Sequence, residues 1–314
     1  MENSKNIIVI GSGIVGWATG HGLIKKGHNV VFVDTNEDTI SKIRQNGYEA
    51  RLPNRLKDVN AEISFLCVPT PSRSDGTINL DHMTNACTTH GKWLGRKTDN
   101  TWHLVVIRST VIPGTTRKLL LPLLEKYSGL KGGKDFGLCM EPEFLRAKSS
   151  EDDFIRARIK VIGEFDTRSG DMLANLYADF AKSIFRIDLD AAEFLKYIHN
   201  CFNATKISFT NEMWLLGKKL GIDVNPLMKI VINSAEGFWN PAYGTVGGKP
   251  YGGTCLPKDS MAFLALAQEN KVNLPLLSAT ISVNKQMEKL ARQGLIEPAT
   301  TDGPMWQPLP LSTN

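Results

Sequence analysis

Short apolar runs alternate with helical patterns along the first half of the chain. The runs are rich in β-branched residues and end at Gly, Pro or polar residues, which is typical of strands. They predict strands at Asn6–Ile10, Asn29–Val33, Ile63–Val68, His103–Ile107, Phe136–Met140 and Ile159–Ile162. Between the first two, Ile14–Lys26 is long enough for a crossover helix. The pattern predicts βαβ units, and therefore an α/β fold with a parallel sheet covered on both faces.

From Asp188 the pattern changes to one continuous 3.6-residue period, with neither Pro nor Gly until Gly217. It predicts a helix roughly 40 Å long. Its apolar stripe consists of Phe194, Ile198, Phe202, Phe209, Met213 and Leu216. Such a stripe usually packs against a second helix or a second chain. A Gly-, Pro- and aromatic-rich segment, Glu236–Gly253, predicts a long functional loop. Further helices are predicted at Pro257–Gln268 and Pro275–Gln293.

This change of pattern predicts three parts of the chain. We expect a sheet domain over residues 1–187 and an all-helical domain, built on the one long helix, over residues 188–293. The last part, 294–314, contains Pro298, Pro304, Pro308 and Pro310 with little hydrophobic periodicity. We expect it to be a loose tail.

Composition excludes several classes of protein. With 314 residues, 42% hydrophobic and 22% charged, the chain is of ordinary globular type. The net charge of +5 comes from 37 basic and 32 acidic residues mixed along the chain, without the basic stripe that nucleic acid requires. The five cysteines, Cys67, Cys87, Cys139, Cys201 and Cys255, show no metal-ligand spacing. From this spacing we expect no metal site. No apolar run is long enough to span a bilayer, and none forms a signal peptide, so we expect a cytoplasmic protein.

The first predicted strand runs into a glycine-rich turn, Gly11–Gly16, with the sequence GSGIVG. Gly11 suits a tight turn, Gly13 lets backbone N–H groups approach a pyrophosphate, and Gly16 permits close packing of helix on sheet. The second strand ends at Asp34, an acid that can bind the adenosine ribose and repels a 2′-phosphate. The context predicts a Rossmann-type site for NAD rather than NADP, and a purely structural glycine turn is the alternative.

Two other strand ends lie where a nicotinamide cofactor would cross the carboxyl edge of such a sheet. They are Cys67–Pro71, with the sequence CVPTP, and Arg108–Thr110. The alternative is that the Pro-Thr-Pro sequence only terminates a strand.

A cysteine follows two flexible glycines late in the chain, in the sequence Gly252–Asp259 (GGTCLPKD). Pro257 favours the first turn of a helix, so Cys255 is expected near a positive helix end with Lys258 close by. Both features favour the nucleophilic thiolate. Asp259, about one helical turn later, is placed to activate a water. The alternatives are an inert cysteine and a carboxylate that satisfies the helix dipole.

On the long helix, Lys196 and Asn200 have i, i+4 spacing and share a face, with Asn203 below them. Both side chains are donors that could stabilise a developing oxyanion. An ordinary solvated surface is the alternative.

Several motifs together resemble the UDP-glucose/GDP-mannose dehydrogenase family over roughly residues 5–290. They occur in the family's order: Gly11–Gly16, Cys67–Pro71, Ser109–Val111 with Pro113-Gly114, Pro142–Leu145, Ala192–Asn200, Asn211-Glu212 and Gly252–Asp259. The resemblance implies two successive NAD-dependent oxidations of a sugar's primary alcohol to a carboxylate, as in a UDP-glucose 6-dehydrogenase. It also implies dimerisation through the long helix.

Roles are carried over to the matching positions. The resemblance implies that Cys255 attacks the intermediate aldehyde and forms a thiohemiacetal, then a thioester that water hydrolyses with help from Asp259. Lys196 and Asn200 would stabilise an oxyanion, and Thr110 and Glu143 would lie near the reacting water and sugar. The implied cofactor contacts are Gly11, Gly13, Ile14, Val15, Gly16, Asp34, Val68, Pro69, Thr70, Thr110 and Lys258. The implied substrate contacts are Glu143, Phe144, Leu145, Lys196, Asn200, Tyr251 and Gly252.

The chain departs from the family in four places. Ala147 stands where the family usually has a second glutamate, and Ser234–Asn240 lacks an arginine that many members send into the neighbouring subunit. The loop Pro241–Gly253 is several residues longer, and a further Rossmann-like domain that grips the nucleotide is not found after Gln293. We therefore expect a smaller or differently held substrate, a partner that supplies the nucleotide-binding domain, or a truncated relative.

Two other functions remain open. A two-electron dehydrogenase of the β-hydroxyacid type would depend chiefly on Lys196 and Asn200 and not on Cys255. A catalytically impaired NAD-binding subunit of a complete homologue would agree with Ala147.

Overall fold

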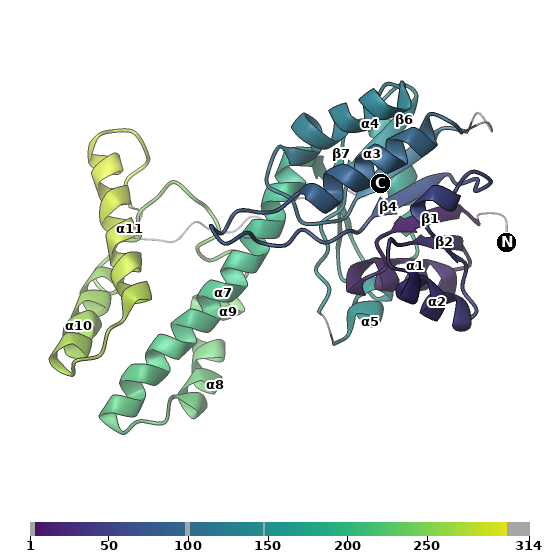
Figure 1. Ribbon diagram of the computed structural model, residues 1–314. Coiled ribbons are helices and arrows are strands. Elements are labelled where there is room, and N and C mark those ends of the chain that lie inside the picture. The colour runs from purple at the N-terminus through teal and green to yellow at the C-terminus, as the bar shows by residue number, and fades with distance from the viewer. Residues whose placement is uncertain (1–3, 98–100, 147, 300–314) are drawn as a thin grey trace. The chain divides into compact units, whose positions relative to one another are not determined.

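The computed structural model describes residues 4–97, 101–146 and 148–299. The chain divides into two compact units, Met1–Asn200 and Cys201–Asn314 (Figure 1). The boundary falls inside a long helix, whose first turns therefore pack with the sheet-containing unit. Ala147 and most of the expected tail, from residue 300 on, lie outside the described residues.

Within the described residues, an eight-stranded sheet forms the centre of the first unit (Figure 1). Its order is β3-β2-β1-β4-β5-β6-β7-β8, and neighbouring strands are parallel except β6 and β7. The strands are β1 (Asn6–Ile10), β2 (Asn29–Val33), β3 (Ala50–Arg51), β4 (Ile63–Leu66), β5 (His103–Ile107), β6 (Phe136–Met140), β7 (Lys160–Glu164) and β8 (Ile184–Asp188). The connections reverse direction between β1 and β4, and ligands of such sheets bind at the carboxyl ends of these strands.

The predicted α/β architecture is confirmed, with corrections at its edges. The expected strand Ile63–Val68 ends at Leu66, and Ile159–Ile162 is replaced by Lys160–Glu164. The predicted parallel sheet is present, with one antiparallel pair, β6–β7. The two outermost strands, β3 and β8, have no counterpart in the prediction. β3 has only two residues, and β8 is largely exposed, so neither produces a buried apolar run.

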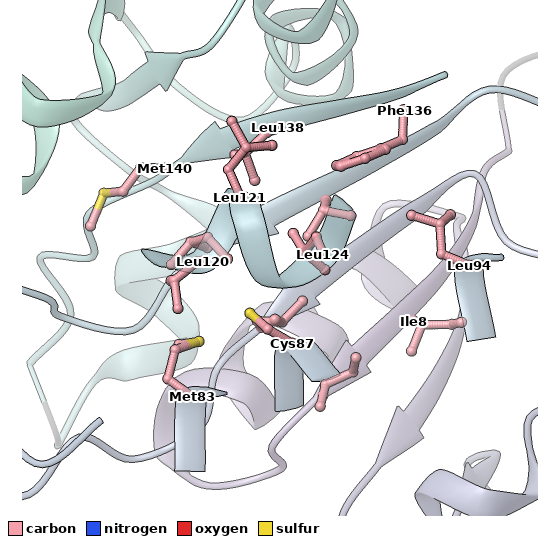
Figure 2. Close-up of a cluster of buried hydrophobic side chains, with 14 of the residues drawn as sticks. Ile8, Met83, Cys87, Leu94, Leu120, Leu121, Leu124, Phe136, Leu138 and Met140 are labelled. Carbon is pink, nitrogen blue, oxygen red and sulfur yellow. The ribbon is translucent and has the colours of Figure 1, made fainter. Parts of the chain in front are cut away.

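Helices cover both faces of the sheet, which is why its central strands are buried and mostly apolar. The helices are α1 (Ile14–Lys25), α2 (Glu37–Gln45), α3 (Asp81–Leu94), α4 (Leu121–Ser128), α5 (Ser150–Ile155) and α6 (Thr167–Tyr177), with a π turn at Thr116–Leu120 and a 3-10 turn at Pro53–Arg55. Ile8 points to one buried cluster and Ile7 to the other. Figure 2 shows the first cluster, to which Met83 and Cys87 of α3, Leu124 of α4 and Leu138 of β6 belong.

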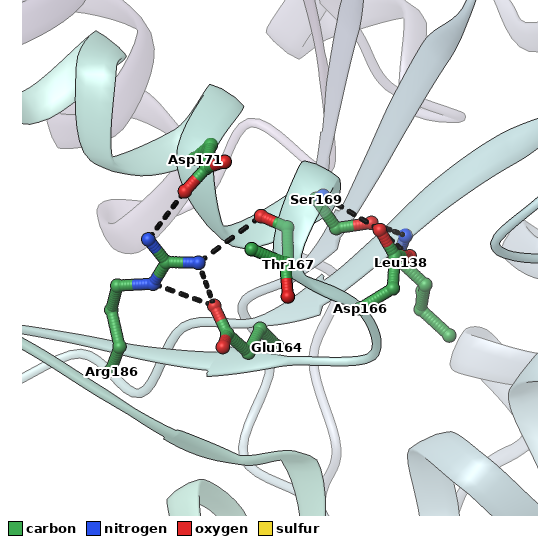
Figure 3. Close-up of polar contacts among 7 residues, drawn as sticks. All are labelled: Leu138, Glu164, Asp166, Thr167, Ser169, Asp171 and Arg186. Atoms are coloured by element: carbon green, nitrogen blue, oxygen red, sulfur yellow. Dashed lines mark hydrogen bonds and ion pairs between the residues drawn. The ribbon is translucent and has the colours of Figure 1, made fainter.

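Polar contacts hold the β7–β8 edge to α6 (Figure 3). The Arg186 guanidinium donates to Glu164 Oε2 at 2.7 Å and also to Asp171. Asp166 is the N-cap of α6, because its Oδ1 accepts from the Ser169 N–H at 2.9 Å. The Ser169 hydroxyl accepts from the Leu138 N–H at 3.1 Å. These contacts order the edge strands where apolar burial is weak.

A second set of polar contacts ties α5 to α1. The Glu151 carboxylate accepts from Trp17 Nε1 at 2.8 Å, contacts His21 Nδ1 at 2.8 Å and pairs with Lys25 at 3.2 Å. Phe154 on the same short helix is fully buried, and a methyl group at Gly22 of α1 would lie 2.2 Å from its ring. The glycine therefore allows the two helices to approach closely.

The predicted long helix is present as α7 (Leu189–Leu220). It continues through Gly217, the first glycine of the segment. A methyl group at Gly217 would lie 2.2 Å from Val224 Cγ2, so this glycine permits close packing and does not break the helix. Along its apolar stripe, Phe194, Ile198 and Phe202 are 50–63% exposed in the single chain, whereas Leu216 is buried.

The rest of the second unit is helical. It contains α8 (Val224–Ser234), α9 (Glu236–Trp239), α10 (Leu256–Glu269) and α11 (Pro275–Arg292). The expected loop Glu236–Gly253 therefore begins with a short helix. Leu216, Ala267 and Leu274 form a small core. The buried Glu212 of α7 accepts from the N–H of Leu276 and, at 3.0 Å, from that of Leu277, so it caps the start of α11.

Substitution of Leu124 tests the packing of α4 on the sheet. Leu124 is fully buried, so Leu124→Ala should lower the free energy of unfolding by about 3 kcal/mol through lost burial and a residual cavity. The measurement is urea denaturation followed by circular dichroism. Lys126→Ala, on the exposed side of the same helix, is the control and should change stability by less than about 0.5 kcal/mol. Equal effects of the two substitutions would contradict the described packing.

Candidate active site

The glycine turn after β1 has three different spatial requirements. Gly11 has φ +87°, and a methyl group there would lie 2.8 Å from the Cys67 carbonyl oxygen. A methyl group at Gly16 would lie 1.8 Å from the Gly11 oxygen, so only glycine lets α1 approach the turn. At Gly13 a methyl group would meet nothing within 4 Å. The turn is thus packed on two sides and open at Gly13, where a ligand can approach the backbone.

Asp34, at the end of β2, is held by two backbone groups. Its Oδ2 accepts from the Ser12 N–H at 2.8 Å and its Oδ1 from the Asn36 N–H at 2.9 Å. These contacts fix the carboxylate beside the glycine turn. Each oxygen retains a lone pair, so the carboxylate can still accept from ribose hydroxyls.

A cavity of about 710 Å³ opens along the carboxyl ends of the central strands, a size suited to a dinucleotide. The predicted cofactor residues that line it are Gly11, Gly13, Ile14, Val15, Asp34, Val68, Pro69, Thr70 and Thr110. Glu143 also lines it. The Thr70 hydroxyl donates to the Thr110 carbonyl at 2.8 Å and so joins the segments after β4 and β5. Gly16 is buried behind the turn and does not line the cavity.

Lys196 of α7 pairs with Glu143. Its Nζ donates to Glu143 Oε1 at 2.7 Å and to the carbonyl oxygen of the same residue. The Lys196 residue is 6% exposed, so the alternative of a solvated surface lysine is wrong. These two bonds use two of its three N–H groups and leave one donor. Asn200, one turn later, is exposed, and the ring of Phe144 packs against His199.

The first turns of α7 are anchored by another buried acid. Glu193 is fully buried, and its carboxylate accepts from the backbone N–H groups of Gly114 and, at 2.7 Å, Thr116. Burial raises the pKa of Glu193 despite these bonds. Because Glu193 and Lys196 are three residues apart, they share a face of the helix. One face of α7 therefore holds both the loop after β5 and the loop after β6.

In the second unit, Cys255 is the residue immediately before α10 and its side chain is exposed. Its carbonyl oxygen accepts from the Asp259 N–H at 2.8 Å, and its Sγ lies 3.7 Å from the Thr254 hydroxyl. The position at a helix start agrees with the prediction. Lys258, which we expected close by, interacts electrostatically with Cys255, and its ammonium forms an ion pair with Asp259. That carboxylate raises the pKa of Lys258.

The loop before Cys255 is fixed by a residue that the sequence analysis missed. Asn284 of α11 is 6% exposed. Its Oδ1 accepts from the Tyr251 N–H at 2.8 Å, and its Nδ2 donates to the Tyr251 carbonyl at 3.0 Å. Gly253 has φ +76°, which allows the chain to turn between this anchor and α10. No local signal marks Asn284, since it acts 33 positions away along the chain.

Two family models match the chain. The model of the UDP-glucose/GDP-mannose dehydrogenase family's NAD binding domain matches residues 5–181, and that of its central domain matches residues 190–286. The chain belongs to this family. It is a family of NAD-dependent nucleotide-sugar dehydrogenases, and the cavity in the first unit lies within its NAD binding domain.

Individual relatives carry two substrate names. A GDP-mannose 6-dehydrogenase of Pseudomonas syringae pv. tomato is 35% identical over 303 residues, covering 88% of this chain and 67% of the relative. A UDP-glucose 6-dehydrogenase of Haloferax volcanii is 33% identical and covers 88% and 68%. The solved structure of a GDP-mannose dehydrogenase from Pseudomonas aeruginosa matches with a TM-score of 0.82 at 31% identity, covering 91% of this chain and 69% of that one. The chain thus spans about two thirds of these relatives.

The structure places the predicted site residues of this family member in two groups. The predicted cofactor residues other than Lys258 lie in the first unit, as do Glu143 and Lys196. Tyr251, Gly252, Cys255, Lys258 and Asp259 lie in the second. Among the described residues, no helix is long and apolar enough to cross a membrane, and no three His, Cys, Asp or Glu side chains gather as a metal site.

One wall of the cavity comes from α3, which the sequence analysis did not assign to a site. The residues His82, Asn85, Ala86 and Thr89 line it. They have the i, i+3, i+4, i+7 spacing of one helix face, which contains small and polar residues where a buried helix would carry large apolar ones. This polar helix face is the signal in the sequence. It can be assigned to the cavity only when the order of the strands in the sheet is known.

Two glycine substitutions test the turn. Gly13→Ala should leave folding almost unchanged, by no more than about 1 kcal/mol, because its backbone is in an allowed region and the space is open in the free protein. It should weaken NADH binding, measured by fluorescence titration, at least about 10-fold, because the methyl group would block the pyrophosphate. Gly16→Ala should instead destabilise the fold. Normal NADH binding by Gly13→Ala would contradict this placement of the cofactor.

Proposed function

We propose that the protein catalyses the NAD-dependent four-electron oxidation of a nucleotide sugar's primary alcohol to a carboxylate. The observation that carries the proposal is the buried Lys196–Glu143 pair at the wall of the dinucleotide cavity. It brings a cation with a spare donor to the end of the sheet where the cofactor's reactive ring is expected. The exposed Cys255 at the start of α10 supports the second oxidation.

The first unit would hold and orient the cofactor. Backbone N–H groups at Gly13 would bind the pyrophosphate, Asp34 the adenosine ribose, and the loops with Val68–Thr70 and Thr110 the nicotinamide end. Bound NAD would supply the hydride acceptor, and two NAD molecules would be used in turn, one for each oxidation. Lys196, with its remaining N–H, and Asn200 would donate to the substrate oxygen as negative charge develops there.

The second unit would supply the covalent step. The Cys255 thiolate would add to the aldehyde carbon to form a thiohemiacetal. Loss of the second hydride from that carbon leaves a thioester, and water then adds and expels the thiolate, giving the carboxylate. Asp259 would accept a proton from this water. Since Asp259 pairs with Lys258, the role requires that this exposed pair opens or shares the proton. We propose that Lys258 contacts the cofactor while Asp259, its carboxylate partner, acts on the water.

The substrate is a nucleotide sugar in this proposal, with UDP-glucose and GDP-mannose as first candidates. The relatives with these names have similar identity to the chain, so identity does not choose between them. Glu143, Phe144, Leu145, Tyr251 and Gly252 are the proposed sugar contacts. We also propose a cytoplasmic enzyme, because both reactants are soluble, charged molecules.

A second candidate is a two-electron dehydrogenase in which Cys255 has no chemical role. One observation favours it: the Asp259 carboxylate pairs with Lys258, so it is not free to activate a water beside Cys255. The two functions differ in the number of NADH molecules formed for each substrate.

Cysteine substitution distinguishes the two functions. With the sugar nucleotide that gives turnover, the wild type should form two NADH per substrate, and Cys255→Ser should lose the acid product while a hemiacetal or acyl adduct accumulates. The measurement is NADH absorbance with mass spectrometry of products and protein. Cys201→Ser, another exposed cysteine, is the matched control and should retain activity. One NADH per substrate, with full activity in Cys255→Ala and none in Lys196→Ala, would support the two-electron alternative instead.

We further propose that two copies pair through α7, supported by the exposed apolar stripe that includes Phe194, Ile198 and Phe202. Replacing Ile198 and Phe202 by Glu should convert a dimer to a monomer, because charges would be buried at the interface. Sedimentation or light scattering checks the mass. The control is Lys218→Glu, which changes charge outside this stripe near the end of the helix. A wild-type monomer at micromolar concentration would contradict the pairing.

A further inference from the structure

A cluster of charged side chains is buried beneath the carboxyl ends of β5 and β6. Arg108, Glu141, Lys160 and Tyr177 are each at most 5% exposed. Lys160 Nζ donates to Glu141 Oε1 at 3.0 Å, and the Tyr177 hydroxyl donates to Glu141 Oε2 at 2.6 Å. Arg108 forms an ion pair with the same carboxylate. One carboxylate therefore serves two cations.

The cluster carries a surplus positive charge. Burial raises the pKa of Tyr177, so its hydroxyl is neutral. Burial works against the Glu141 carboxylate, but Arg108 and Lys160 outweigh it and lower its pKa. Two cations and one anion leave a charge of +1 in the interior. Aromatic faces partly stabilise it, since Lys160 Nζ lies 4.0 Å from the Phe154 ring centroid and 4.2 Å from that of Tyr177.

No protein anion balances this surplus within the cluster. Arg108 Nε has no hydrogen-bond acceptor in the described part of the chain. Buried cations normally have a full set of acceptors, because an uncompensated charge in the interior costs several kcal/mol. The missing negative charge is therefore expected from something that binds nearby.

The nearest open space is the dinucleotide cavity, which Arg108 itself lines. Cys67 connects the two: its thiol lies within electrostatic range of Arg108, and its Cβ would lie 3.3 Å from a methyl group at Gly16 in the glycine turn. Among the described residues that line the cavity, Arg108 is the only Lys or Arg, whereas Asp34 and Glu143 are acids. An anionic dinucleotide thus enters a cavity with few positive side chains.

We propose that the surplus positive charge of the Arg108–Glu141–Lys160 cluster strengthens binding of the cofactor's pyrophosphate. It acts at a distance, through the electric field that it creates in the cavity. Lys160 provides the surplus, and Glu141 with Tyr177 holds both cations in place. In a poorly hydrated interior such a field is only weakly screened. The inference rests on the assignment of the cavity to the dinucleotide in the proposed function. These residues position charge and do not touch the reacting atoms.

The experiment compares a charged and an uncharged ligand of the same cavity. Calorimetry measures the affinity of the full chain for ADP and for adenosine, in the wild type and in Lys160→Met, which leaves a neutral Arg108–Glu141 pair. The Kd for ADP should rise roughly 5- to 20-fold in Lys160→Met, as expected for the loss of one partly screened charge, and that for adenosine should change less than about 2-fold. Lys160→Gln, which keeps a polar contact with Glu141, should behave in the same way.

Lys26→Met is the matched control. Lys26 also lies over an aromatic ring, with its Nζ 5.0 Å from the Phe180 centroid, but it is exposed. Its loss should leave both affinities unchanged. Equal losses for ADP and adenosine in the Lys160 variants would show a merely structural role and overturn the inference, as would an unchanged ADP affinity. Failure of the wild type to bind either ligand would overturn the cavity assignment together with the inference.

The pH dependence gives a second readout. Burial lowers the pKa of Lys160 to about 8, even though Glu141 opposes the shift. The charged or titratable groups facing Lys160 are Glu141, which follows β6, Arg108, which follows β5, and Tyr177 of α6. The pKa of Glu141 is lowered and those of Arg108 and Tyr177 are raised, so none of the three titrates near 8. ADP affinity of the wild type should fall as the pH rises through and above 8, when the ammonium becomes neutral. Lys160→Met should show no such fall, and a parallel fall in both proteins would contradict the proposal.

Discussion

The close approach of α1 to the end of β1 is the constraint on which the cofactor cavity depends. Because Gly16 has no side chain, the first turn of α1 lies against the Gly11 carbonyl at a distance that no other residue allows. The same approach leaves the backbone of the turn exposed at Gly13 and places Ser12 where its N–H reaches Asp34. The open backbone at Gly13, the placement of Asp34 and this wall of the cavity all follow from one packing contact.

The other end of the cavity depends on α7. Glu193 holds the loop after β5 and Lys196 holds Glu143 in the loop after β6, and the two residues are one turn apart. A single rigid helix therefore sets the distance between the two loops. This arrangement explains why a lysine that belongs to the family's central domain is buried in the unit that contains the sheet. The helix carries out a structural task and at the same time holds Glu143, which lines the cavity.

Much of the first unit could be predicted from the sequence because its strands are short, apolar and bounded by breakers. The segments after β1, β4 and β5 were correctly grouped, since parallel strands end at one edge of the sheet. Three features were not accessible. Strand β8 lacks a buried apolar run. The face of α3 that lines the cavity can be recognised only when the order of the strands is known. Asn284 acts through a contact with Tyr251, which is distant in the sequence. Charge pairing was equally hidden, because Glu141 follows β6 and Lys160 begins β7, and these two strands pair only in the folded sheet.

The bonds of Glu151 have a consequence for the cavity as a whole. This residue belongs to α5, which follows the loop that carries Glu143, and it is bonded to Trp17, His21 and Lys25 of the helix that begins at the glycine turn. The segment from β6 to α5 is thus fastened at both ends, to the sheet on one side and to α1 on the other. The two halves of the cavity are therefore joined through α5, so the placement of the loop that carries Glu143 depends on the placement of α1.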